Sequence, residues 1–199
     1  MNVIVGDDGK ARCAWSANDA DYRRYHDEEW GVALHGDHEL FEKLALEGFQ
    51  AGLSWLIILR RRPDLRNAFH NFDVHAVAAM TATDVEKLMQ NARIIRNRAK
   101  IKATIANAMV TRNLIRERPG ALDELLWSFA PSPRAQRPAT SADVQAVTAE
   151  STAMSAALKT LGYRFVGPTT LHALMQSCGM VNDHLEDCWR AHSVWPPRD

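Results

Sequence analysis

Two pairs of cysteine and histidine lie near opposite ends of the chain, and each pair combines a thiol with an imidazole. Cys13 and His26 stand near the start, and His184 and Cys188 stand near the end. Together they form the Cys₂His₂ set that binds zinc tetrahedrally in structural sites. Four protein ligands leave no coordination position for water, so we expect a zinc ion that joins the two ends of the chain and takes no part in chemistry.

Three further histidines could replace one member of this set, and we expect them to be surface residues: His35, His38 and His192. A zinc hydrolase would need three protein ligands and one open position, whereas four suitable ligands are available here. The remaining cysteine, Cys178, is expected to be a small buried residue near a helix end. An odd number of cysteines does not suggest a disulfide framework.

The segment from Glu47 to Trp55 places a carboxylate and an indole eight residues apart, with two glycines between them. Gly48 and Gly52 interrupt the helical pattern and permit a turn or a close backbone approach. Ser54 is positioned to cap the helix that follows. The same segment is compatible with a plain packing joint between two helices, in which Trp55 is a core residue and Glu47 a surface charge.

Aromatic residues are concentrated around the candidate ligand His26. Four of the nine tryptophans and tyrosines fall within sixteen residues: Trp15, Tyr22, Tyr25 and Trp30. Aromatic walls together with a carboxylate suit a flat, electron-poor heterocycle, which stacks on the rings and is hydrogen-bonded at its edge. The alternative is that these aromatic residues form a core around the zinc ion.

The charge is balanced overall but uneven along the chain. Lysine plus arginine residues number 24, and so do aspartate plus glutamate residues. Residues 92–118 contain eight basic residues and one acidic residue. A basic zone on an otherwise acidic body is typical of a surface that binds a polyanion, although a solvated helix face would show the same pattern.

Apolar residues recur at helical spacing nearly throughout the 199 residues, so we predict an all-α fold of short helices with short connections. Asp73 is expected to cap a helix over residues 74–80. Thr83 and Glu86 have the spacing of a capping box for the next helix. We expect residues 12–199 to form one domain, or two closely packed helical subdomains, after a flexible extension over residues 1–11.

Later in the chain, three helices are predicted from their apolar spacing and their Gly and Pro boundaries: residues 98–118, about 152–162 and 168–179. Pro131–Thr140 is the best loop candidate, and Tyr163–Val166 is the only, short, strand candidate. The start of the chain lacks the basic and apolar regions of a signal peptide, and no apolar run approaches the length of a membrane span. We therefore expect a protein of the reduced cytoplasm without a membrane partner.

A series of motifs runs in order from about Arg12 to Cys188: Trp15, Tyr22-x-x-Tyr25-His26-Asp27-x-Glu29-Trp30-Gly31-Val32, Leu40-Phe41-Glu42, Glu47 to Trp55, Ile94-Ile95-Arg96-x-Arg98-x-Lys100-Ile101, Trp127-Ser128-Phe129, Phe165-Val166-Gly167 and Val181-Asn182-Asp183-His184. In this order the motifs resemble the DNA-3-methyladenine glycosylase I family. Several are five residues or longer, and together they cover nearly the whole chain.

The resemblance implies an all-α, helix-hairpin-helix DNA glycosylase with one structural zinc ion, held by the same four ligands that ligand chemistry selects. It implies Glu47 and Tyr25 as catalytic residues of a base pocket, with Trp55 as a stacking partner and Trp15 and Tyr22 as further walls. We expect Leu53, which follows Gly52, to enter the gap left by the flipped base.

The implied reaction begins when the damaged base leaves the stack, because the glycosidic bond is otherwise out of reach. Adenine alkylated at N3 is cationic, so it is a good leaving group and stacks on aromatic rings by cation–π attraction. Glu47 can accept a hydrogen bond from the exocyclic amino group of this base. Many related glycosylases use an aspartate to assist the attacking water, but Asp123 is expected to be a helix-start or surface acid here.

The resemblance places the hairpin at residues 91–98, where backbone N–H groups and a helix N-terminus bind phosphate. The basic residues expected to contact DNA there are Arg93, Arg96, Arg98 and Lys100. Arg93 and Ala99 stand where glycines are expected in this family. Because loss of a glycine can forbid a positive φ, we expect an altered hairpin backbone.

The expected partner is double-stranded DNA that contains alkylated bases, and the expected state is a monomer, associated with the nucleoid when bound to DNA. A function of a different class would be a non-catalytic, zinc-stabilised module that binds DNA damage without cleaving it. Glu47 with its aromatic neighbours discriminates between the two, since a pure phosphate binder needs no such pocket.

Overall fold

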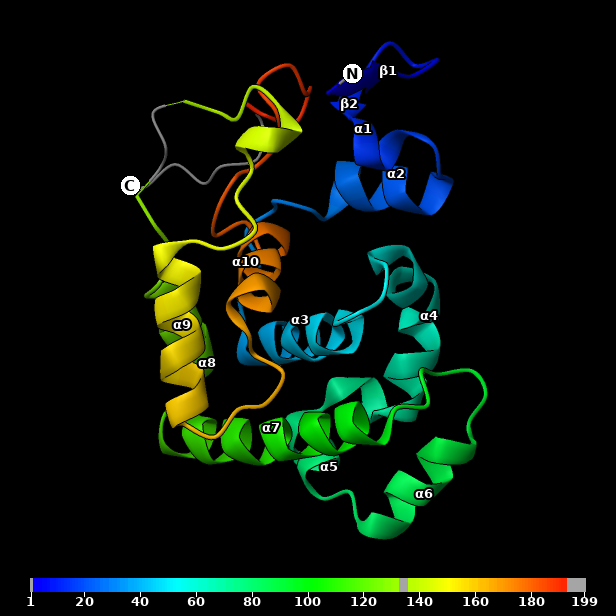
Figure 1. Ribbon diagram of the computed structural model, residues 1–199. Helices are drawn as coiled ribbons and strands as arrows, with labels where there is room; N and C mark the ends of the chain where they lie inside the picture. The colour runs from blue at the N-terminus through cyan, green and yellow to red at the C-terminus, as the bar shows by residue number, and fades with distance from the viewer. Residues whose placement is uncertain (1, 133–135, 193–199) are drawn as a thin grey trace.

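The computed structural model describes residues 2–132 and 136–192, and their structure confirms the predicted all-α class (Figure 1). The predicted loop over 131–140 carries no helix or strand in its described part; residues 133–135 lie outside the described ranges. The helices are α1 (Ala14–Ala17), α2 (Ala20–Glu28), α3 (Asp37–Gln50), α4 (Trp55–Ala68), α5 (Val74–Ala78), α6 (Ala82–Gln90), α7 (Arg98–Glu117), α8 (Ala121–Trp127), α9 (Ala149–Thr160) and α10 (Pro168–Ser177), with short 3₁₀ turns at His70–Phe72 and Ser141–Asp143.

The start of the chain is a β-hairpin where we predicted a flexible extension. Strand β1 (Val3–Val5) pairs antiparallel with β2 (Ala11–Cys13), so that Val3 lies opposite Cys13. The guanidinium of Arg12 fixes the hairpin by donating to both carboxylate oxygens of Asp8, at 2.8 and 2.6 Å. The prediction missed these strands because three residues are too few to show a period of two.

Capping residues begin two of the short helices. Asp73 accepts a hydrogen bond from a backbone N–H in the first turn of α5, as predicted. The capping box predicted at Thr83 and Glu86 is wrong by two residues, because Asp84 accepts from both the N–H and the hydroxyl of Thr81. Thr83 and Glu86 therefore lie within the helix that this pair begins.

Helices α6 and α7 and the loop between them form the predicted helix-hairpin-helix element. Within the described residues, the non-glycine residues with positive φ lie elsewhere, at 70–72 and 165. Arg93 therefore needs no conformation that only glycine adopts easily, and Ala99 lies in the first turn of α7. The replacement of glycine at these positions imposes no φ strain on the hairpin, contrary to our expectation.

The later helices lie within a few residues of their predicted bounds, but the strand candidate is wrong. Residues 163–166 connect α9 to α10 without strand geometry. Phe165 has φ of 56°, which is incompatible with a strand, and its conformation is held by hydrogen bonds that join Asn107 to both backbone groups of Arg164, at 2.8 and 3.0 Å.

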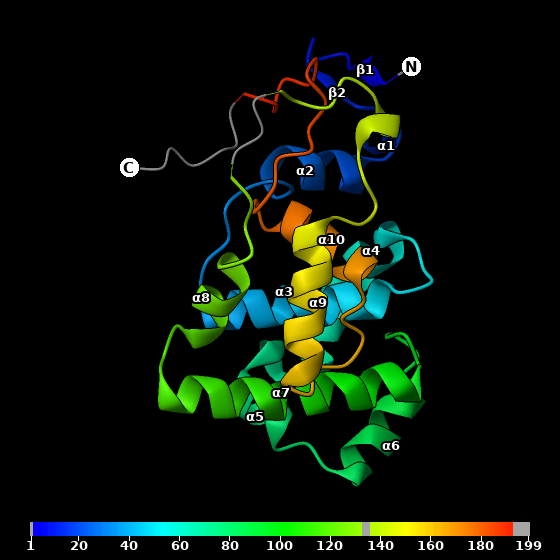
Figure 2. The same cartoon turned by 60° about the vertical axis from the view of Figure 1, so that its left-hand side comes forward.

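Helix α3 lies at the centre of the fold and packs against α4, α7, α8 and α10 (Figures 1 and 2). Its apolar face supplies Leu40, Phe41, Leu44 and Phe49 to the main core. At one end of the molecule, the β-hairpin, α1 and α2 meet the segment that follows α10. That arrangement brings the N-terminal hairpin against residues 178–192, and the contact between them buries a small cluster of its own: Cys13, Leu185, Cys188 and Ala191.

No helix in the described part of the chain is both long enough and apolar enough to cross a bilayer. The organisation of residues 12–199 as a single domain stays a prediction.

Candidate active site

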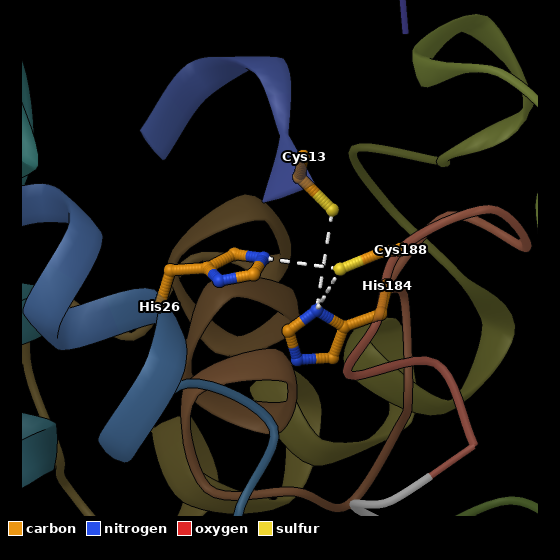
Figure 3. A group of neighbouring side chains, drawn as sticks. All are labelled: Cys13, His26, His184 and Cys188. Atoms are coloured by element: carbon orange, nitrogen blue, oxygen red, sulfur yellow. Dashed lines mark hydrogen bonds between the residues drawn. The ribbon is translucent and has the colours of Figure 1, made fainter. Parts of the chain in front are cut away.

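The four predicted ligands converge where the N-terminal segment meets the segment after α10 (Figure 3). Cys188 Sγ lies 3.4 Å from His26 Nε2 and 3.5 Å from His184 Nδ1, and Cys13 Sγ lies 4.0 Å from His184 Nδ1. All four side chains are buried. Bonds of about 2.0–2.3 Å to a tetrahedral ion would hold neighbouring ligand atoms about 3.5 Å apart. The side chains therefore fit a four-coordinate metal ion with little movement.

The outer partners of the two imidazoles select the nitrogens that point inward. His26 Nδ1 lies 2.8 Å from Asp27 Oδ1, and His184 Nε2 lies 3.1 Å from the carbonyl oxygen of Trp30. A metal-binding histidine commonly donates its second N–H to such a carboxylate or carbonyl. Burial raises the pKa of Asp27, but hydrogen bonds from Arg12 and His26 outweigh burial and lower it overall. Asp27 is therefore held as the anion that a ligating histidine requires.

The spare histidines lie outside this cluster, as expected. His35 Nδ1 lies 2.9 Å from a carboxylate oxygen of Asp123, and His38 Nε2 donates to a backbone carbonyl at 2.8 Å. His192 is exposed. Asp123 lies in the first turn of α8 and also accepts from the N–H of Gly36 at 2.6 Å. Its contacts are those of a structural acid outside the aromatic cavity.

A cavity of about 640 Å³ lies beside the cysteine–histidine cluster, and the five residues predicted to form a base pocket all line it: Trp15, Tyr22, Tyr25, Glu47 and Trp55. Its size is within the range of small-molecule sites. The rings of Tyr25 and Trp55 are buried, with centroids 5.4 Å apart at 46°. Trp15 is 42% exposed and meets the Tyr22 ring edge-on at 5.5 Å, so it forms an outer wall.

Glu47 is a buried carboxylate that the surrounding protein leaves half satisfied. Its side chain is on α3, the residue is 3% exposed, and Oε1 accepts a hydrogen bond from Ser177 Oγ at 3.1 Å. Oε2 is buried and has no hydrogen-bond partner among the described residues. Burial raises the pKa of Glu47 to about 7, against the opposing effects of Lys43 and Ser177. The site can therefore bind a ligand that supplies positive charge or hydrogen-bond donors.

Lys43 is a residue of this region that the sequence analysis missed. Its ammonium lies 5.2 Å from the ring centroid of Tyr25, 5.7 Å from that of Trp55 and 3.9 Å from a carboxylate oxygen of Glu29. It lines a neighbouring cavity rather than the aromatic one. The signal that could have found it is its position four residues before Glu47 on the same helix.

His172 and Asp183 were also missed, and both line the aromatic cavity. Nε2 of the buried His172 lies 3.3 Å from Asp183 Oδ2, and Gln176 donates to the same oxygen at 2.8 Å. A lone histidine in an apolar helix gives no sign of such a position. Asp183 stands in one of the recognised motifs, but spacing alone does not show which way it points.

The turn between α3 and α4 carries Leu53, which is 37% exposed. Gly48 does not interrupt the helix as expected; it lies within α3, and an added Cβ would be 3.6 Å from the Cβ of Phe165. Gly52 forms the turn, with φ of 78°. Ser54 stands at the start of α4, as predicted, but its side chain makes no capping hydrogen bond.

The predicted DNA contacts separate into exposed and buried residues. Arg93 and Arg96 are exposed on the hairpin, and Arg98 is exposed but forms an ion pair with Glu86. The prediction that Lys100 contacts DNA is wrong, because only 6% of the residue is exposed. Its ammonium donates to two backbone carbonyls at the end of α3, at 2.7 and 2.6 Å, and is directed into the protein.

Comparisons with known proteins agree on one family. Residues 15–191 match the family described as methyladenine glycosylase. DNA-3-methyladenine glycosylase 1 of Escherichia coli is 44% identical over 178 residues, which cover 89% of this chain and 95% of that protein. DNA-3-methyladenine glycosylase of Haemophilus influenzae is 44% identical over 179 residues, which cover 89% of this chain and 96% of that protein.

Solved structures of this kind also have the same fold. A crystal structure of 3-methyladenine DNA glycosylase I superimposes with a TM-score of 0.86 at 42% identity and covers 89% of this chain and 98% of that one. The Staphylococcus aureus enzyme, described by its recognition of 3-methyladenine, superimposes with a TM-score of 0.84 at 33% identity and covers 94% of this chain and 98% of that one.

Replacing Glu47 by glutamine should stabilise the protein at high pH and not at low pH. A carboxyl group whose pKa rises from 4.5 to about 7 on folding destabilises the folded state as pH increases through that window. Above pH 8 the buried carboxyl group lowers the free energy of unfolding by roughly 3 kcal/mol, and this effect falls below about 1 kcal/mol near pH 5. Denaturant unfolding of the parent and Glu47→Gln from pH 5 to 8.5 measures the difference.

The exposed Glu117 provides the control, since Glu117→Gln should leave the pH dependence of unfolding unchanged. A Glu47→Gln variant whose stability follows that of the parent in parallel across this range would contradict the prediction.

Proposed function

Because the chain belongs to the methyladenine glycosylase family, we propose that it acts in base-excision repair and hydrolyses the N-glycosidic bond of 3-methyladenine in alkylated DNA. The observation that carries the proposal is one buried oxygen, Glu47 Oε2. It has no hydrogen-bond partner in the described part of the chain, and Glu47 lines the same cavity as Tyr25 and Trp55. A flat cation that carries an amino group supplies the hydrogen-bond donor and the positive charge that this oxygen lacks. Neutral adenine supplies the amino group but not the charge.

In the proposed reaction, the damaged nucleotide leaves the stack and its base enters the aromatic cavity. Tyr25 and Trp55 stack against the ring, and Glu47 binds the exocyclic amino group. As the bond from C1′ to N9 breaks, its electron pair passes to the base, which becomes neutral. Water forms the new bond to C1′ and releases a proton to solvent. Glu47 thus selects the base that is already charged.

The products should be free base and an intact strand with an abasic site. A glycosylase that also cuts the strand forms a Schiff base with an amine, and no lysine among the described residues lines the aromatic cavity. Lys43 lies close to the rings, but it lines the neighbouring cavity, where its ammonium pairs with Glu29. These positions support a monofunctional hydrolase.

A non-catalytic module that senses DNA damage is the alternative function. Such a protein would need the exposed arginines of the hairpin, but it would gain nothing from a buried carboxylate that is costly to ionise. The fact that Glu47 is buried in the same cavity as the tilted rings of Tyr25 and Trp55 therefore favours the enzyme.

The ion proposed for the cysteine–histidine cluster is zinc, one per chain, with a structural role. Two thiolates and two imidazoles are a common zinc shell, and zinc has no redox chemistry that would endanger DNA. Zinc would connect β2 and α2 to the segment after α10. With four protein ligands it would hold no water, so the attacking water must come from the cavity.

We propose double-stranded DNA as the partner, with the enzyme working as a monomer in the cytoplasm and associating with the nucleoid through DNA. The α6–α7 hairpin supports the DNA part of this proposal, because Arg93 and Arg96 extend from it into solvent. Arg61 braces the hairpin from α4 by donating to the carbonyl oxygens of Ala92, at 3.2 Å, and of Arg93.

The purified protein should contain about one zinc ion per chain, as measured by elemental analysis. Cys13→Ser and Cys188→Ser should each lower the zinc content and the melting temperature, because binding energy at such sites is folding energy. The rate of base excision per folded molecule should change much less. Absence of zinc, or full zinc retention after replacement of all four ligands, would contradict this prediction.

Single-turnover assays on methylated duplex DNA should show release of free 3-methyladenine, identified by chromatography. Glu47→Gln keeps the shape of the side chain and removes its charge, so excision should slow markedly while affinity for undamaged DNA changes little. Trp55→Ala should lose stacking worth about 1–3 kcal/mol. Glu117→Gln serves as the surface control. If excess zinc-loaded parent protein releases no base, the non-catalytic module becomes the better hypothesis.

Charge reversal at Arg93 or Arg96 should weaken binding to any duplex sequence alike. Each lost phosphate contact should lower the log–log dependence of affinity on salt by about one. Arg116, exposed in the last turn of α7, provides a matched arginine outside the hairpin. If Arg116→Glu has the same effect as the hairpin variants across a salt titration, then the basic zone binds DNA diffusely and the hairpin has no special role.

A further inference from the structure

The connection between α3 and α4 begins with a type II β-turn. The carbonyl oxygen of Gln50 accepts a hydrogen bond from the N–H of Leu53 at 2.6 Å. Ala51 has φ of −45° and ψ of 115°, and Gly52 has φ of 78°. These angles are those of the second and third positions of a type II turn, in which glycine is favoured at the third position.

This turn leads from the base cavity to the protein surface. Gln50 at its start lines the aromatic cavity beside Glu47 and Trp55. Leu53 at its end is one of eight large apolar side chains that are exposed in the described part of the chain. The conformation of the turn therefore decides where Leu53 points relative to the cavity.

The ammonium group of Lys100 is hydrogen-bonded to the backbone of this turn. Lys100 Nζ donates to the carbonyl oxygen of Phe49 at 2.7 Å and to that of Ala51 at 2.6 Å. Lys100 lies in the first turn of α7, immediately after the hairpin loop, and its own N–H donates to the side chain of Asn97 at 3.2 Å. The ammonium also balances the negative end of the α3 dipole.

The contact with Ala51 is the one that selects the turn type. Type I and type II turns differ in the orientation of the central peptide: ψ of the second residue is about −30° in type I and about +120° in type II. The carbonyl of that central peptide is the carbonyl of Ala51. Rotation to type I would point this oxygen away from Lys100, so the hydrogen bond at 2.6 Å favours type II.

We propose that Lys100 is a positioning residue that couples the DNA-binding hairpin to the turn that carries Leu53, so that Leu53 enters the duplex at the gap left by the flipped base. The proposal rests on the function proposed above. Lys100 itself contacts neither phosphate nor base. It acts through the carbonyls of Phe49 and Ala51, and it links two segments that both face DNA.

Lys100→Met keeps the aliphatic stem and removes the donors, so it separates this role from a phosphate contact. We expect single-turnover excision from duplex DNA to slow by about tenfold or more, which is the range of a lost hydrogen bond to a charged group. The salt dependence of duplex binding should stay that of the parent. The affinity for free 3-methyladenine, measured by tryptophan fluorescence, should also be unchanged. Lys100→Arg should restore part of the rate.

Gly52→Ala provides an independent route to the same defect. A Cβ added at Gly52 meets no atom within 4 Å, so its cost comes from the positive φ alone. It should therefore reproduce the slow excision without touching Lys100. In a Leu53→Ala background, Lys100→Met should slow excision little further, because the side chain that it positions is already absent.

Methyl NMR signals of Leu53, followed on addition of undamaged duplex, test the coupling without base release. They should shift in the parent and shift much less in Lys100→Met. A parent that releases no base but shows this pattern would refute the proposed function and leave the coupling intact. A salt slope reduced by about one in Lys100→Met would instead identify a phosphate contact and overturn the proposal. Excision by Lys100→Met at the parent rate would also overturn the proposal, and so would effects of Lys100→Met and Leu53→Ala that add in the double variant.

A defect of folding is separated by thermal melting of each variant. If Lys100→Met does not fold, Lys100→Arg and Gly52→Ala still test the turn, since neither removes charge from the buried site. If Gly52→Ala folds and excises base at the parent rate, the geometry of the turn does not matter and the proposal fails.

Discussion

The cysteine–histidine cluster is the constraint on which the base cavity depends. Its ligands come from both ends of the chain, and two of them lie almost next to walls of the cavity. Tyr25 immediately precedes His26 in α2, and Trp15 follows Cys13 by two residues. An ion held by these ligands would fix both aromatic rings through the backbone, so the metal would shape a pocket that it does not enter. Arg12 reinforces the same joint by binding Asp8 and Asp27 at once.

The second determinant is the cost of keeping Glu47 charged. The carboxylate is buried, and among the described residues only Ser177 donates to it, while the ammonium of Lys43 lies 5.2 Å from the ring centroid of Tyr25. Complete satisfaction by protein donors would stabilise the anion but remove its preference for a cationic ligand. In the proposed function, partial satisfaction leaves a free energy that a positively charged base would recover, so that stability would be exchanged for selectivity in this pocket.

The structure brings together both sets of residues that the sequence singled out: the four cysteines and histidines selected by ligand chemistry, and the five cavity-lining residues implied by the family resemblance. The sequence could not tell which basic residues face solvent. Lys100 shares a face of α7 with Thr104, Asn107 and Thr111, spaced four, seven and eleven residues away, and all of them are buried. A polar stripe of this kind resembles a solvated face, and its burial depends on partners distant in the sequence. Lys100 donates to carbonyl groups at the end of α3, Asn107 bonds the backbone of Arg164, and Thr111 bonds the hydroxyl of Tyr163. The N-terminal hairpin was missed for a different reason, because its strands are only three residues long.

Helix α3 connects these features, since the proposed base recognition and the proposed DNA engagement both rest on it. Its middle carries Lys43 and Glu47 against the aromatic rings, and its last carbonyls are held by Lys100 from the hairpin helix. A movement of the hairpin on DNA would reach Gln50 and the neighbouring cavity through one rigid helix and one turn. Such a path requires a connection whose ends cannot relax independently. The two hydrogen bonds of Lys100 supply that connection, which explains why a lysine in the basic zone is more useful inside the protein than on its surface.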